Sequence, residues 1–151
     1  MSKSNTFETE LLQLIFQNTG IANIGDATGL RGSTAAGLLY IALHTADPGE
    51  AGTATTSEIS YTGYARQGLA RNSANFPVSA GVMSLGVNVD FPEMTGGTGG
   101  TVTHWSVVKE VSGASVILYS GTVTPNQIIA TGVIPRLKGT PSGTPSTVTE
   151  D

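Results

Sequence analysis

The chain has 151 residues, a length that suits one domain with a single core. Charged residues make up only 12% and the formal net charge is −4, without a cluster of Lys and Arg, so direct nucleic-acid binding is not expected. The absence of cysteine excludes disulfides, thiol catalysis and Cys-ligated metals, and two histidines are too few for a His-only zinc site.

Neither a membrane span nor a secretion signal is predicted. No apolar run approaches the ~20 residues that cross a bilayer. The start of the chain, MSKSNT, is not followed by the apolar segment of a signal peptide. We therefore expect a protein that folds in a cytoplasm and has no membrane partner.

The first predicted element is a helix over about residues 7–17, with Asn5 as its N-cap and Gly20 as its end. Its apolar residues recur at i, i+4, i+7 and i+8, which is the helical period, and Leu12 and Phe16 widen the stripe. A short helix with such a stripe must bury it, on its own sheet or on a neighbouring subunit. The stripe is a candidate interface and consists of Phe7, Leu11, Leu14 and Ile15.

After a small-residue connection, the chain reads as strands separated by turns. We expect strands over residues 38–45, 61–71, 76–79, 82–91, 101–109, 115–123 and 127–137. Pro125-Asn126 is expected to close a strand pair, and Pro135 to place the last strand at a sheet edge, because proline cannot donate to a ladder. The predicted fold is mainly β: a single-domain β-sandwich or jelly-roll-like barrel over residues 1–138, with one short N-terminal helix.

The last segment, residues 139–151, reads GTPSGTPSTVTED and is predicted to be an extended tail. Its composition cannot bury enough apolar surface to fold alone. We expect an adjacent subunit to supply the missing contacts, with Val148 as the only sizeable apolar side chain and therefore a further interface candidate.

The chain offers little that resembles catalytic or ligand-binding chemistry. His44 and Asp47 are a possible base and orienting carboxylate, but no nucleophile is evident near them, and a strand end followed by an Asp turn explains both. The carboxylates lack the close spacing of a calcium loop, and the glycine-rich residues 96–100 lack the lysine of a phosphate-binding loop. We predict no catalytic residue, no metal and no cofactor, and expect that the protein is not an enzyme.

Three aromatic residues allow two interpretations. Trp105 lies in an apolar strand, where a lone tryptophan is typical of a core or interface anchor. Alternatively, Trp105, Tyr61 and Tyr64 could offer stacking faces to a sugar. We keep all three as interface candidates.

Three segments resemble short virion proteins of tailed bacteriophages that are described as tail fibre or head-decoration (capsid cement) proteins. They are LYIALHTADPG at residues 39–49, YTGYAR at residues 61–66 and LYSGTVTP at residues 118–125. NVDFP at residues 88–92 is also similar, so the likeness extends over about residues 7–138. The resemblance implies a structural part of a phage particle, synthesised in the cytoplasm of a bacterial host.

Low charge, β-rich composition and two ends able to reach neighbours favour a capsid cement protein on the capsid surface. It would bridge major capsid subunits, would itself be a homo-oligomer, and would stabilise the assembled head. The alternatives are a minor tail or tail-fibre component, a carbohydrate-binding module on the virion surface and, from another class, a small hydrolase.

Overall fold

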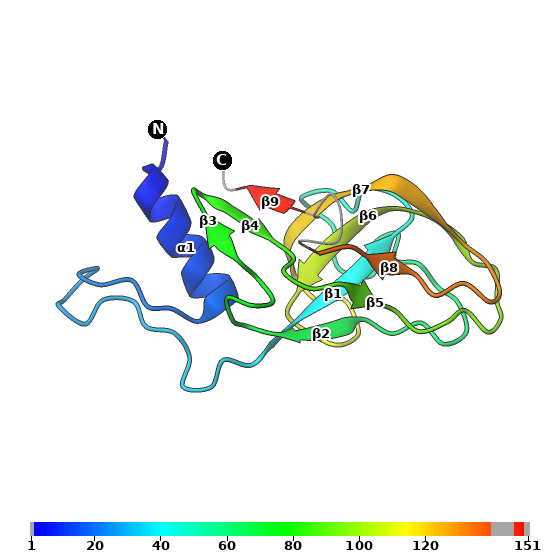
Figure 1. Ribbon diagram of the computed structural model, residues 1–151, viewed down its shortest axis with the longest axis horizontal. Coiled ribbons are helices and arrows are strands. Elements are labelled where there is room, and N and C mark those ends of the chain that lie inside the picture. Colours follow the sequence, from blue (N-terminus) through cyan, green and yellow to red (C-terminus); the bar gives the residue numbers. More distant parts are fainter. Residues whose placement is uncertain (1, 140–146, 150–151) are drawn as a thin grey trace.

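The structure, a computed structural model, describes residues 2–139 and 147–149 and is built around one antiparallel sheet (Figure 1). Its strand order is β2-β1-β6-β7, in which β1 is Leu38–His44, β2 is Gln67–Ala70, β6 is Gly100–Val108 and β7 is Ile117–Ile129. Two small antiparallel sheets accompany it: β5 (Val89–Asp90) with β8 (Arg136–Leu137), and β4 (Val82–Ser84) between β3 (Val78–Ser79) and β9 (Thr147–Thr149). The prediction of a mainly β fold with one N-terminal helix is confirmed.

The helix α1 spans Asn5–Gln17 and is capped differently from the prediction. Its N-cap is Ser4, whose hydroxyl accepts the Phe7 N–H at 3.3 Å, so the assignment of Asn5 was off by one residue. Its C-cap is Asn18 in the left-handed conformation, two residues before Gly20. Asn18 suits this place because asparagine tolerates that conformation, and because its side chain bonds both the carbonyl and the N–H of Ser33.

The core lies on the face of β1 that carries Leu39, Ile41 and Leu43. In the ladder with β6, Ile41 is opposite Val107 and Leu43 is opposite Trp105. These residues join one buried cluster with side chains from the β5–β8 region, namely Val89, Phe91, Met94 and Leu137. Each large apolar side chain buried in this way contributes about 1.5–3 kcal/mol of transfer free energy. The small β5–β8 sheet therefore acts as the second layer of the domain.

Several predicted strands are shorter in the structure, among them residues 76–79, of which only β3 is a strand. Of residues 61–71, only β2 joins the sheet, because Tyr64 closes a turn onto Tyr61 (N–H to carbonyl, 3.0 Å) and the side chains that follow enter a polar network. Residues 82–91 form β4 and β5 with an interruption between them. There the Gly86 N–H donates to the Asn75 carbonyl and not to a strand partner. Apolar residues alternate with polar or small ones along this segment of the sequence, and four of them are buried, Met83, Leu85, Val89 and Phe91, while Val87 is half-buried.

The strand β7 runs through the point where a turn was expected at Pro125-Asn126. The register jumps from Thr122 opposite His104 to Gln127 opposite Val102, so the proline lies in a bulge. Because β7 is the outer strand of its sheet and the bulge is unpaired, no ladder donor is lost at Pro125. The expected turn was therefore wrong. The strand predicted over residues 127–137 is wrong as well, because β7 ends at Ile129 and β8, which pairs with β5, begins directly after Pro135.

Part of the predicted C-terminal tail is described. The backbone of β9 pairs with β4 of the same chain, with Val148 opposite Met83. Residues 140–146 and 150–151 lie outside the described residues. No helix within the described ranges is long and apolar enough to span a bilayer.

Candidate assembly surface

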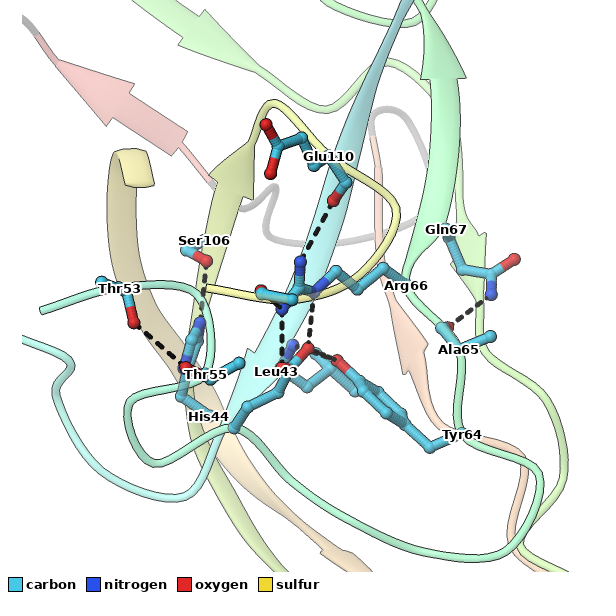
Figure 2. A network of polar contacts seen from close by, with 12 residues as sticks. Leu43, His44, Thr53, Thr55, Tyr64, Ala65, Arg66, Gln67, Ser106 and Glu110 are labelled. Atoms are coloured by element: carbon cyan, nitrogen blue, oxygen red, sulfur yellow. Dashed lines mark hydrogen bonds and ion pairs between the residues drawn. The ribbon is translucent and has the colours of Figure 1, made fainter. Parts of the chain in front are cut away.

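Two of the sequence segments that carry the phage resemblance meet in a buried polar network (Figure 2). At its centre, Arg66 forms a bidentate ion pair with Glu58: Nε to Oε1 is 2.7 Å and Nη2 to Oε2 is 2.8 Å. The two side chains are only 3% and 14% exposed. The hydrogen bonds that Arg66 donates to the Glu58 carboxylate are the main cause of the raised pKa of Arg66, so the guanidinium stays charged.

The same arginine connects this pair to the turn that joins β6 and β7. Its Nη1 donates to the Glu110 carbonyl at 3.1 Å and its Nη2 to the Gly113 carbonyl at 2.7 Å. Tyr64 completes the network, because its hydroxyl donates to Glu58 Oε1 (3.0 Å) and accepts the Leu43 N–H (3.1 Å). Burial raises the pKa of Tyr64, which keeps the hydroxyl protonated as a donor. Tyr64 and Arg66, the Tyr-x-Arg segment, thus hold the loop of Glu58 and the β6–β7 turn against β1.

A Ser–His pair lies beside this network. His44 Nε2 is 2.7 Å from Ser106 Oγ, and His44 Nδ1 is 2.9 Å from the Thr56 carbonyl. Since a carbonyl only accepts, Nδ1 carries the proton, and Nε2 accepts from the serine hydroxyl. Burial lowers the pKa of His44, which favours this neutral form.

This spacing is that of a nucleophile and its base, but neither residue is exposed at all. A substrate cannot reach Ser106 in this conformation, so the pair acts as an internal hydrogen bond. Asp47 takes no part: its Oδ1 accepts the Gly49 N–H at 2.9 Å, the turn-forming bond expected of it. The serine partner was missed in the sequence because it lies 62 positions from His44 and only the strand register brings them together.

Of the three aromatic interface candidates, Trp105 and Tyr61 are buried and Tyr64 is half-buried. Trp105 is fully buried and Tyr61 is 7% exposed. The Tyr64 ring stacks on Phe91 with centroids 6.2 Å apart and meets the edge of Tyr61 at 5.3 Å. These rings pack on one another and on the core, so they form no exposed platform for a sugar.

The candidate interface stripe on α1 lies at least partly at the surface. The helix buries Leu12 and Phe16 instead. The centroid of the Phe16 ring is 5.3 Å from that of Phe76 and 5.4 Å from that of Tyr119. Phe7 is 36% exposed, and the other stripe residues are half-buried: Leu11, Leu14 and Ile15. The helix therefore docks with one row of apolar residues and leaves the predicted row partly open.

Part of this open row lines a groove of about 510 Å³ between α1 and the sheet. Leu14 and Ile15 form the helix side, while Leu38, Leu39 and Leu118 come from β1 and β7. Leu38, the first residue of β1, is 49% exposed. The groove is thus an apolar surface that the described part of the chain does not cover.

Arg71 holds the helix side of the groove in place. Its Nε and Nη2 donate to the carbonyls of Ile15 and Leu14, each at 2.5 Å, and its Nη1 donates to the Ala36 carbonyl at 3.2 Å. The carbonyls of Leu14 and Ile15 belong to the last turn of α1, where a positive charge also complements the helix dipole. The helix and the segment before β1 are therefore fixed relative to one another.

The rim of the groove comes from the segment between α1 and β1, which extends away from the sheets before it returns (Figure 1). It is closed on itself by paired backbone bonds between Ile21 and Leu30, both 2.8 Å. Asp26 turns the tip: its Oδ1 accepts the Thr28 hydroxyl and N–H, and these bonds lower the pKa of Asp26. This small hairpin places Arg31 at the groove.

Val148, the remaining candidate, is placed by its backbone alone, on β9 next to β4. Among the residues that the structure describes, no group of three or more His, Asp or Glu side chains could hold a metal ion.

Comparison with known proteins identifies the family. A family model described as "Podophage GP4 fiber I protein gp80" matches residues 2–140, which include α1, β1 to β8, the polar network and the groove. No curated protein matches the chain. The match supports the tail-fibre side of the resemblance, and it implies a component of the virion. The chain belongs to the podophage GP4 fiber I protein gp80 family of phage fibre proteins.

Proposed function

We propose that this protein is a structural component of a phage tail fibre and works by docking to other virion subunits rather than by catalysis. The observation that carries the proposal is the family match over residues 2–140, nearly the whole described chain. It favours the tail-fibre alternative over the capsid cement function that the composition suggested.

The use of polar side chains in the domain supports a structural role. The groups with the most reactive character, His44 and Ser106, are sealed inside and bonded to one another. Arg66 and Glu58 likewise form an internal ion pair that holds loops together. What the domain offers outside is a partly exposed apolar helix face and the groove beside it, features that mark contacts between proteins.

The partners that fit this role are other tail subunits and further copies of the chain. Capsid decoration, with the major capsid protein as partner, is the competing proposal, since a cement protein also needs exposed contact surfaces. Position on the particle separates the two. Gold-labelled antibodies against this chain should mark the tail region of purified virions. Labelling spread evenly over the head would refute the fibre assignment and favour cement.

A further inference from the structure

The groove beside α1 is surrounded by positive charge. Arg31, Arg71 and Lys109 all line it, whereas no Asp or Glu is among its lining residues. Three of the chain's seven Lys and Arg residues therefore gather at one groove, in a protein whose formal net charge is −4. A local field of opposite sign to the net charge attracts a carboxylate-bearing partner and disfavours a basic one.

These cations approach the groove from different elements. Arg31 is exposed on the segment that precedes β1, and Lys109 is exposed directly after β6. Arg71 directly follows β2 and donates only to neutral acceptors among the described residues, namely the carbonyls of Leu14, Ile15 and Ala36 and the hydroxyl of Ser33. No carboxylate of the described chain therefore cancels its charge.

The walls between these cations are apolar. Leu14, Ile15 and Leu118 are half-buried and Leu38 is 49% exposed. Covering these side chains would remove apolar surface from water, which supplies affinity, while the surrounding charges supply orientation. The two requirements together describe a ligand that carries an apolar side chain close to a carboxylate.

We propose that this groove is the docking site for an acidic, apolar segment of another virion protein. The segment places a large apolar side chain against Leu38 and Leu118, and an Asp or Glu beside it faces Arg31 and Lys109. This assignment rests on the proposed fibre function, which supplies the setting in which such a partner is met.

Charge reversal in the groove tests the proposal. A phage lacking the gene is complemented with Lys109→Glu, with Arg31→Glu, or with the matched control Lys138→Glu, an exposed lysine outside the groove. Incorporation into purified virions is measured by quantitative mass spectrometry, and thermal melting of each purified variant confirms folding. Both groove variants should lower incorporation by about tenfold or more, because attraction becomes repulsion, while the control incorporates like the wild type.

Zero-length cross-linking of intact virions identifies the occupant. A carbodiimide joins an amine to a carboxylate only when the two are in contact, so the Lys109 amine should become linked to an Asp or Glu in an apolar stretch of a different virion protein. A link to a carboxylate of a second copy of this chain would overturn the stated occupant. Lys109→Glu and Arg31→Glu virions with wild-type occupancy would overturn the site itself.

Failure of the docking site and failure of the fibre function give different results. If wild-type protein is absent from the tail, the fibre function fails. If it is present there but both groove variants incorporate normally, only the docking site is wrong.

Discussion

The Arg66 guanidinium and the Glu58 carboxylate face each other as a bidentate pair at 2.7 and 2.8 Å inside the domain. A second bidentate pair, Arg136 with Asp90, lies at the surface, where the two side chains are 52% and 47% exposed. The same chemistry thus occurs in two settings within one chain. Comparing the two pairs therefore isolates how much burial adds to the contribution of an ion pair to stability.

Removal of the buried arginine should destabilise the domain far more than removal of the exposed one. Arg66→Met leaves the Glu58 charge buried without its partner, which costs about 3–5 kcal/mol. Arg136→Met breaks a solvated pair worth roughly 0–1 kcal/mol. Urea unfolding of the two variants gives the comparison. Equal losses would mean that the network around Glu58 is not rigid.

Stability should fall as the pH drops below the ordinary histidine pKa of about 6.5. Burial lowers the pKa of His44, so the unfolded chain binds the proton more readily than the folded one. The contribution of neutral His44 is complete above the unfolded pKa and is lost as the pH falls toward the folded one. The unfolding free energy from pH 8 to pH 5 measures this loss.

His44→Gln provides the control, since it removes the titrating group from the same place. Its stability should be lower at pH 8 and should change less between pH 7 and pH 5 than that of the wild type. If the wild type has the flatter profile, His44 does not titrate in the way that its burial implies.

The two phenylalanines of α1 should respond differently to truncation. Phe16 is fully buried between Phe76 and Tyr119, and Phe16→Ala should cost about 3–5 kcal/mol. Phe7 is 36% exposed, so Phe7→Ala should cost less than about 1 kcal/mol. Thermal melting distinguishes them. Comparable losses would mean that Phe7 and the predicted stripe are packed as tightly as Phe16.

The helix shows where sequence reasoning succeeds and where it stops. The spacing of apolar residues predicts α1 and nearly its bounds, because a period of 3.6 residues is a local property. It does not say which of two adjacent rows meets the sheet, since that depends on Phe76 and Tyr119, which are distant in sequence. The alternation of side chains over residues 82–91 likewise indicates most of the buried positions around β4 and β5, because a period of two residues is also a local property.

The polar network could not be predicted because it depends on strand register and loop paths. Glu58 lies in a loop without distinguishing sequence, yet it reaches Arg66 eight positions later. Ser106 meets His44 diagonally across the ladder, where His44 is opposite His104. The groove could not be predicted from the sequence either, because its charged residues come from three separate segments.

The segment that carries Arg31 should be sensitive at one glycine and tolerant at another. Gly29 has a φ of +61°, and an added Cβ would lie 1.9 Å from the Ile21 carbonyl oxygen. Gly25 also has a positive φ, but its Cβ would meet nothing within 4 Å. Gly29→Ala should therefore open the Ile21–Leu30 pairing, whereas Gly25→Ala adds only about 1–2 kcal/mol of backbone strain.

Hydrogen exchange at the Ile21 and Leu30 amides reports on that pairing. Protection should be lost in Gly29→Ala and kept in Gly25→Ala. Full protection in both variants would show that the segment accommodates the extra carbon by shifting, and that the close approach does not define its shape.

Copy number per virion tests the assignment to the tail most directly. Quantitative mass spectrometry of purified particles, with the major capsid protein as internal reference, gives the ratio of the two chains. A fibre component is expected in a small, fixed number of copies per particle, in proportion to the other tail proteins. Hundreds of copies in a fixed ratio to the capsid protein would contradict the fibre assignment and establish a decoration protein of the head.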